Sequence, residues 1–131
     1  MEEERVFEVK WREGTVLKIY RVAYSREVIR ILNLEDLGYQ REVRAFEVYS
    51  DGRFRFAYGI EYRTGERKIL RSISGVVPYE AFKKACEYVD GAFVIYKSLK
   101  EKGVEYIDDV AIDYLENAIM TVFKAYWETK K

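Results

Sequence analysis

The chain has 131 residues, of which 49% are hydrophobic and 35% charged, and its 23 basic and 23 acidic side chains cancel. This length and composition predict one soluble globular domain spanning residues 1–131, and the balanced charge gives no overall preference for a polyanionic partner. Histidine is absent, which excludes Ser-His-Asp and Cys-His catalysis and the usual histidine-bearing zinc and iron sites, so a bound metal would need oxygen ligands.

The beginning of the chain and its single cysteine indicate a cytoplasmic protein. The opening MEEERVFEV is acidic, unlike a signal peptide, and no apolar run approaches membrane-spanning length. Cys86 has no partner for an internal disulfide, which fits a reducing compartment. Few amide side chains among many charges are typical of heat-stable proteins. We expect neither a cofactor nor a membrane partner.

The first third of the chain contains one clear hairpin and one ambiguous segment. Residues 5–12 and 15–24 are rich in β-branched and aromatic side chains and predict a hairpin around the turn at 13–14. In residues 26–37, the preceding serine could cap a helix and Gly38 could end it. The letters VIRIL within this segment also alternate like a strand. Of the two interpretations, we predict the helix.

Three further strands are predicted at residues 43–50, 53–62 and 66–74. Asp51-Gly52 is a strong signal for a two-residue hairpin turn in which both positions need positive φ. Arg63-Thr64-Gly65 fits a three-residue turn with its glycine in the left-handed position. These two turns set the predicted register of the three strands.

Two long helices are predicted after these strands. Pro78 suits a first helical position and Gly103 a stop, although Gly91 leaves a short strand at 92–96 as an alternative. Asp108 can cap the second helix. Apolar residues recur at helical spacing along both segments. The first stripe comprises Phe82, Ala85, Cys86, Val89, Phe93, Tyr96 and Leu99, and the second comprises Ala111, Leu115, Ala118, Ile119, Val122 and Tyr126.

These elements predict an α+β fold. An antiparallel sheet of about five strands, made of the N-terminal hairpin and a three-stranded meander, is packed by the two C-terminal helices. The predicted register puts Phe54, Phe56 and Tyr58 on the face that the helices cover. Glu47 falls beside Phe56, and we interpret it as a paired carboxylate at the margin of the core. The alternative is a buried acid with a raised pKa.

The opposite face of the predicted sheet is rich in arginine. Glu61 lies opposite Arg67 and can pair with it, while Ala57 and Gly59 form a low floor. The candidate ligand-binding residues on this face are Arg44, Phe46, Arg53, Arg55 and Arg71, four cations without an adjacent acid and one ring for stacking. Alternatively, the arginines only solubilise the sheet, or residues 26–37 or a second copy of the chain cover this face.

We interpret the protein as a small non-catalytic binding protein, with single-stranded nucleic acid as the expected ligand of the arginine-bearing face. A second interpretation is an interaction module acting through homodimerisation. Ile112, Phe123 and Trp127 support it, because they lie off the main stripe of the last helix and widen its apolar surface. A third interpretation is a carboxylate-dependent enzyme using Glu47. No catalytic or metal-ligating residues are predicted.

Overall fold

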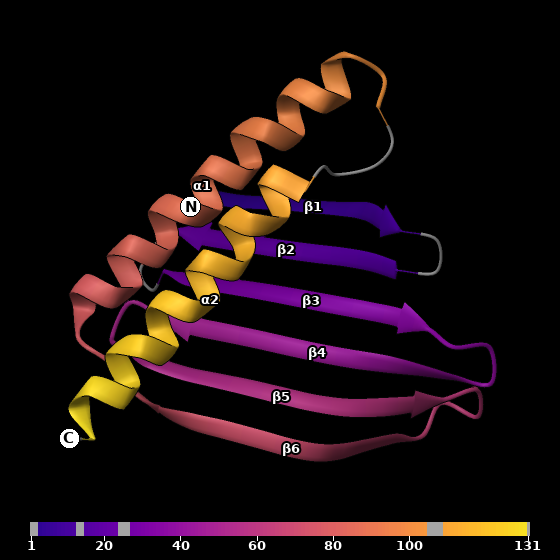
Figure 1. The fold of residues 1–131 in the computed structure, drawn as a ribbon, viewed down its shortest axis with the longest axis horizontal. Coiled ribbons are helices and arrows are strands. Elements are labelled where there is room, and N and C mark those ends of the chain that lie inside the picture. Colours follow the sequence, from indigo (N-terminus) through magenta and orange to yellow (C-terminus); the bar gives the residue numbers. More distant parts are fainter. Residues whose placement is uncertain (1–2, 13–14, 24–26, 105–108, 131) are drawn as a thin grey trace.

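The described residues form an antiparallel sheet followed by two helices (Figure 1). In the computed structural model of the chain, the described backbone covers residues 3–12, 15–23, 27–104 and 109–130, and side chains are described at 18–19, 27–104 and 109–130. The elements are β1 Glu3–Arg12, β2 Thr15–Ala23, β3 Val28–Asp36, β4 Gln40–Tyr49, β5 Arg53–Tyr62, β6 Arg67–Val76, α1 Tyr79–Glu101 and α2 Asp109–Thr129. The predicted α+β class and the two C-terminal helices are confirmed.

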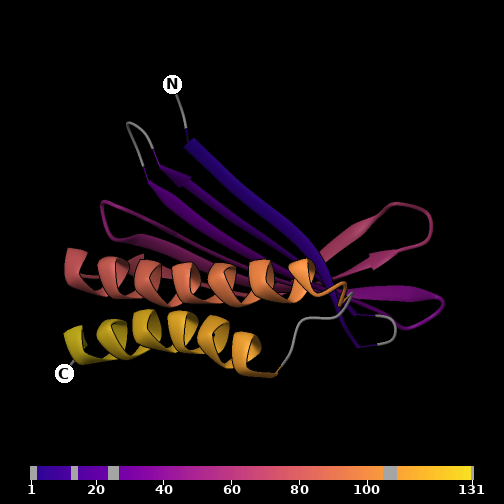
Figure 2. The same cartoon turned by 90° about the horizontal axis from the view of Figure 1, so that it is seen from above.

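The sheet is an up-and-down meander in which each strand pairs with its neighbour in the sequence. Its order is β1-β2-β3-β4-β5-β6, and all five pairings are antiparallel. Both helices lie on one face and cross the strands at one half of the sheet only (Figures 1 and 2). The other half, which holds the β3–β4 and β5–β6 turns, extends beyond them. We call the face turned away from the helices the open face.

The segment predicted as a helix at residues 26–37 is a strand, so the sheet has six strands. Ile29 and Ile31 are 0% and 4% exposed beneath the helices, whereas Arg30 between them is exposed on the open face. This alternation matches a half-buried strand, and it outweighs the helix-ending signal of Gly38. Gly38, with φ 93°, instead helps to form a tight turn, which the Leu37 N–H closes on the carbonyl of Gln40 at 2.8 Å. The predicted turn at 13–14 lies outside the described residues.

The register between β4 and β5 differs from the predicted one by one residue. Gly52 has φ 92° and its N–H donates to the carbonyl of Tyr49 at 2.9 Å, whereas no non-glycine residue among those described has positive φ. The loop therefore contains three residues rather than the two of a primed turn. The strand partner of Phe56 is Phe46, whereas the predicted partner was Glu47. A shift of one residue moves every side chain of β4 to the opposite face from the one predicted.

The turn between β5 and β6 follows the prediction near its tip. Gly65 has φ 89°, its N–H donates to the Tyr62 carbonyl at 2.9 Å, and Ile60 pairs with Lys68. A bulge then leaves Leu70 between the partners of Tyr58 and Gly59, so the rest of β6 is shifted by one residue. The predicted partnership of Phe56 with Ser72 is therefore wrong, and the partner of Phe56 is Ile73.

Helix α1 begins and ends close to the predicted positions, and α2 begins close to its predicted start. Pro78 is the N-cap of α1, one residue before the first helical position. At the other end, the N–H groups of Gly103 and Val104 donate to the carbonyls of Lys100 and Leu99, both at 3.0 Å, in a Schellman arrangement. Helix α1 continues through residues 92–96, which rules out the strand alternative there. The predicted cap of α2 lies outside the described residues.

The core lies between the helices and the covered half of the sheet. The predicted helical stripes are confirmed at Phe82, Val89 and Val122, which are fully buried. Phe123 of α2 brings the sheet aromatics together, because its ring centroid lies 6.2, 5.9 and 5.6 Å from those of Phe46, Phe54 and Phe56. Such tilted and edge-to-face contacts are the favoured arrangement of aromatic rings.

We predict that Phe46→Ala lowers the free energy of unfolding by about 3–5 kcal/mol, as large truncations in a core do. Phe46 is only 2% exposed and packs against Phe123. Phe56→Ala should cost less, because Phe56 is only partly buried. Chemical denaturation of both variants measures the difference. A loss below about 1 kcal/mol for Phe46→Ala would favour the register with a two-residue turn.

Candidate functional site

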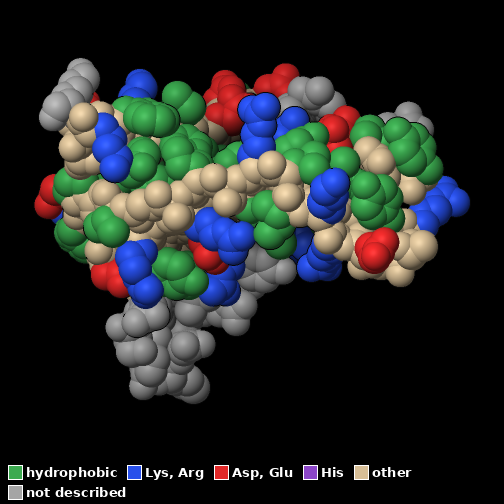
Figure 3. Space-filling model, turned by 90° about the horizontal axis from the view of Figure 1, so that it is seen from below, with side chains coloured by type: hydrophobic (Ala, Val, Ile, Leu, Met, Phe, Trp, Pro, Cys, Tyr) green, Lys and Arg blue, Asp and Glu red, His purple; other side chains and the backbone are tan. Residues whose placement is uncertain are grey.

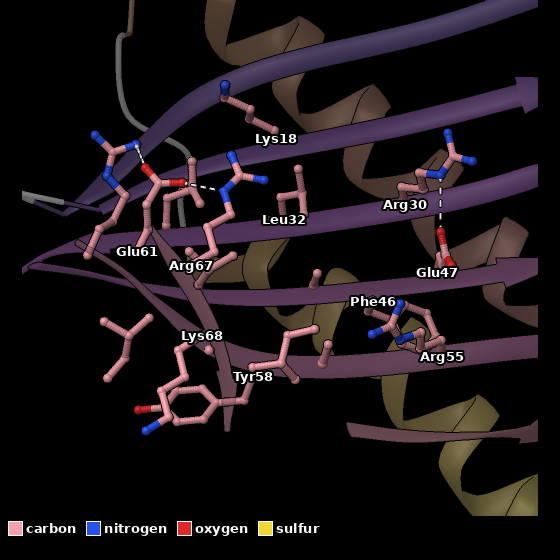
Figure 4. Close-up of a pocket in the computed structure, with 18 residues that line it drawn as sticks. Lys18, Arg30, Leu32, Phe46, Glu47, Arg55, Tyr58, Glu61, Arg67 and Lys68 are labelled. Carbon is pink, nitrogen blue, oxygen red and sulfur yellow. Dashed lines mark hydrogen bonds and ion pairs between the residues drawn. The ribbon is translucent and has the colours of Figure 1, made fainter. Parts of the chain in front are cut away.

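A shallow groove with a volume of about 450 Å³ lies mainly on the open face of the sheet (Figure 4). Strand alternation and the observed register bring most of its lining side chains to this face. We call it the open-face groove. Its residues are Lys18, Arg30, Leu32, Leu34, Arg41, Val43, Ala45, Phe46, Glu47, Arg55, Ala57, Tyr58, Gly59, Ile60, Glu61, Arg67, Lys68 and Ile69.

The floor of the open-face groove is apolar and low. Ala45 and Ala57 are direct neighbours across β4 and β5, and Leu32 pairs with Ala45 on the other side. The two alanines are smaller than the surrounding side chains and leave the centre of the open face low. Gly59 is restricted to glycine by the chain beside it, because a Cβ at this position would lie 2.5 Å from the backbone carbonyl oxygen of Lys68. The floor is therefore built into the strand pairing.

One end of the groove carries a charge cluster centred on Glu61. Its Oε2 accepts a hydrogen bond from Arg67 Nε at 2.8 Å, and its Oε1 lies 3.9 Å from Arg41 Nη1. Figure 4 shows Glu61 and Arg67 directed toward each other. The predicted pairing of Glu61 with Arg67 is confirmed, and β4 supplies a second arginine. Two guanidinium groups on one carboxylate leave a net positive charge at this end of the groove.

The other end is organised by Glu47. Its Oε2 lies 3.3 Å from Arg30 Nε, and the same guanidinium donates to the Tyr49 hydroxyl at 3.3 Å. The hydrogen bond to Tyr49, together with Glu47, raises the pKa of Arg30. The placement of Glu47 beside Phe56 at the core margin is wrong. Its pairing with an arginine is confirmed, and it is not the buried acid that the enzyme interpretation needs.

Arg55 stands opposite Glu47 in the register, yet the described residues offer it no ion pair. It is exposed on the open face, and its side chain reaches the groove (Figure 4). Because a guanidinium carries five donors and remains charged at any ordinary pH, Arg55 is the cation on this face best placed to receive an external anion.

The five predicted ligand-binding residues are divided between the two faces. Arg53 and Arg55 lie on the open face; Arg53 is held at the strand end by Asp51, with Nε 2.8 Å from Oδ2. Arg44, Phe46 and Arg71 belong to the helix-side face by alternation from the observed pairs. Phe46 is a core residue and cannot stack on a ligand. The predicted site therefore does not assemble as a unit.

Arg44 joins a separate polar cluster on the helix side of the uncovered half-sheet. The Tyr58 hydroxyl donates to Glu42 Oε1 at 2.9 Å, and this hydrogen bond raises the pKa of Tyr58. Arg44 Nη2 lies 3.9 Å from Glu42 Oε2, and its guanidinium carbon is 5.7 Å from the centroid of the Tyr58 ring. These contacts direct Arg44 away from the open face.

Four cations that line the open-face groove were not assigned to it from the sequence, namely Lys18, Arg30, Arg41 and Lys68. Arg30 was not assigned to the open face because its segment was predicted to be a helix. The alternation of apolar and polar residues in VIRIL was the signal that could have assigned it there. Among the described residues, six lysines and arginines line the groove against two glutamates, which gives a formal charge of six minus two, or +4, on a chain of zero net charge. The balanced composition conceals this local excess.

The described residues contain no group of three or more acidic or cysteine side chains arranged to hold a metal ion. Neither described helix is apolar enough over a sufficient length to cross a membrane. Comparison with protein-family models, with curated proteins and with solved structures finds no match to this chain. The chemistry of the open-face groove itself is therefore the best indication of function.

We predict that Gly59→Ala destabilises the protein by about 1–3 kcal/mol, the usual cost of overpacking. The added Cβ would meet the Lys68 carbonyl and would lie 3.3 Å from Ile69 Cα, so backbone rather than a flexible side chain must move. Thermal and denaturant unfolding measure the loss. An unchanged midpoint would mean that β5 and β6 separate easily beside the bulge.

Proposed function

We propose that the protein binds single-stranded nucleic acid on the open face of its sheet and has no catalytic activity. The observation that carries this proposal is the excess of four positive charges among the described residues of a shallow apolar groove, on a chain whose overall net charge is zero. Phosphate recognition depends mainly on such arginine and lysine contacts, and these supply most of the affinity in sequence-independent binding.

The distribution of the cations favours an extended polyanion over a small anion. They come from five neighbouring strands, β2 to β6, and adjacent strands are about 4.8 Å apart. Arg41 and Arg67 stand at one end of the groove, and Arg30 and Arg55 at the other. A single carboxylate or phosphate would use one end only, whereas a strand with successive phosphates can use both.

The floor supports binding with little base preference. Leu32, Val43 and Ala57 offer aliphatic contact to bases, and the groove contains no amide side chain to read base edges. The phenol of Tyr49 lies beside the Arg30 end, where Arg30 donates to its hydroxyl. A shallow open sheet suits flexible single strands better than a rigid duplex.

Homodimerisation remains the second candidate. Tyr114, Met120 and Trp127 of α2 are exposed by 37%, 48% and 56%, which leaves apolar surface that a second copy could cover. The exposed apolar surface of α2 is smaller than the helix pattern indicated, because Ile112 is buried and Phe123 packs against the sheet. We therefore rank a dimer below nucleic-acid binding.

A titration of labelled single-stranded DNA and RNA at low and moderate salt tests the proposal. We expect measurable binding at low salt that weakens as salt rises, with a log-log slope of about −0.7 per phosphate contacted. The double variant Arg41→Glu with Arg55→Glu reverses one cation at each end of the groove and should abolish this binding. Circular dichroism and melting should show an intact fold, because both side chains are exposed.

The matched control is the double variant Arg44→Glu with Arg71→Glu. It makes the same change in net charge on residues that alternation assigns to the helix-side face. Binding lost equally in both variants would indicate a general charge effect rather than the groove. No binding by the unmodified protein at low salt would contradict the proposal, and sedimentation of a salt-insensitive dimer would favour the second candidate.

Glu61→Gln should strengthen nucleic-acid binding about two- to fivefold, because it releases Arg41 and Arg67 from a surface ion pair worth about 0.4–1 kcal/mol. Both arginines would then present their full charge to phosphate. The same titration at low salt measures the change. Unaltered or weaker binding would mean that Glu61 orients the two arginines and does not compete with the ligand for them.

A further inference from the structure

Strand β6 is an edge of the sheet that no described element covers. It spans ten residues at one end of the strand order, and Arg67 to Ser72 are all exposed. Figure 3, which views the molecule from the β6 side of Figure 1, shows a belt of tan atoms, backbone and uncharged polar groups, that runs from the left of the picture to its centre between patches of apolar and basic side chains. Such an edge presents backbone donors and acceptors to a further strand.

The pairing with β5 determines which backbone groups of β6 point outward. The Val77 N–H donates to the Gly52 carbonyl at 3.0 Å, and Gly75 and Ile73 continue this series opposite Phe54 and Phe56. In an antiparallel ladder, the N–H and C=O groups of intervening residues point the other way. Ser72, Ser74 and Val76 therefore direct theirs away from the sheet, in a row that an added strand can pair with.

The side chains along this edge combine apolar surface with unbalanced positive charge. Ile69 and Val76 are each 60% exposed. Arg67 is paired with Glu61, but Lys68 and Arg71 make no ion pair with the described residues. The strand itself contains no acid, and Glu66 lies in the turn before it. The edge therefore has two available cations close to exposed aliphatic side chains.

We propose that the β6 edge binds an extended segment of a partner protein that alternates acidic with aliphatic residues, adding it to the sheet as a further strand. The partner's backbone pairs with Ser72, Ser74 and Val76, and its carboxylates meet Lys68 and Arg71. Backbone pairing supplies affinity in this mode of recognition, and the side chains supply selectivity. The inference rests on β6 alone and does not depend on the open-face groove binding nucleic acid.

The charges argue against the pairing of two β6 edges. Two β6 edges would bring Lys68 and Arg71 of both copies to one seam with no carboxylate on either strand. With the strand ends matched, antiparallel pairing with the other edge strand, β1, would set Lys10 and Arg12 against the beginning of β6, although Glu8 of β1 would lie opposite Arg71. Cations on an edge strand repel another cationic strand, whereas acidic side chains on a partner strand form favourable cross-strand pairs with them.

The test uses two labelled twelve-residue peptides, one alternating glutamate with valine and the other lysine with valine, and fluorescence anisotropy with the full chain. We expect the acidic peptide to bind at least about tenfold more tightly than the basic one. Ser74→Pro removes an outward N–H without removing a bond to β5, and it should weaken binding at least about tenfold. Ser74→Ala is the control and should bind normally.

A second pair of variants keeps the proposal testable if proline disturbs the strand. Lys68→Gln with Arg71→Gln should weaken binding of the acidic peptide, whereas Arg41→Glu with Arg55→Glu, altered in the open-face groove, should retain it. Equal binding of the two peptides, or no effect of the Lys68 and Arg71 changes, would overturn the proposal. So would a dimer in sedimentation that Ser74→Pro converts to monomer, because a second copy would then occupy the edge.

Discussion

Gly52 joins three parts of the molecule through its own backbone. Its N–H donates to the Tyr49 carbonyl and closes the loop between β4 and β5, while its carbonyl accepts from the Val77 N–H at the end of β6. A Cβ at this position would collide with the Val77 carbonyl oxygen, so the close approach requires glycine as much as its φ of 92° does. One residue thus sets the register of the central strands and positions the chain for its turn into α1.

The division of residues between the two faces follows from that register. With Phe46 opposite Phe56, the aromatic side chains of β4 and β5 meet Phe123 of α2, and the core closes around them. The same alternation sends Arg41, Glu47 and Arg55 to the open face, where they surround a floor of small residues. The packing of the core and the charge of the groove are therefore two results of one loop length.

The sequence predicted most elements but not the way their faces combine. Helices α1 and α2 and the turn at 63–65 could be read directly, because their apolar spacing and left-handed glycines are local signals. Ser50-Asp51-Gly52 contains a glycine that suits either a two- or a three-residue loop, so the register depended on hydrogen bonds that composition does not reveal.

The same uncertainty explains why the predicted site residues were divided between the two faces of the sheet. Arg53 and Arg55 were placed on the open face because β5 alternates clearly, whereas Arg44 and Phe46 moved with the register, and Arg71 moved with the bulge at Leu70.

The helices cover only half of the sheet, and this has a consequence for local stability. In the covered half, separating the strands also breaks apolar contacts with Phe82, Val89 and Val122. In the other half, the tips of the β3–β4 and β5–β6 hairpins are held by ladder hydrogen bonds and surface ion pairs such as Glu61 with Arg67. Regions with few buried apolar contacts open at lower free energy than a core. Amide protons in these tips should therefore exchange with solvent through local openings, while those beneath the helices exchange only when the whole domain unfolds.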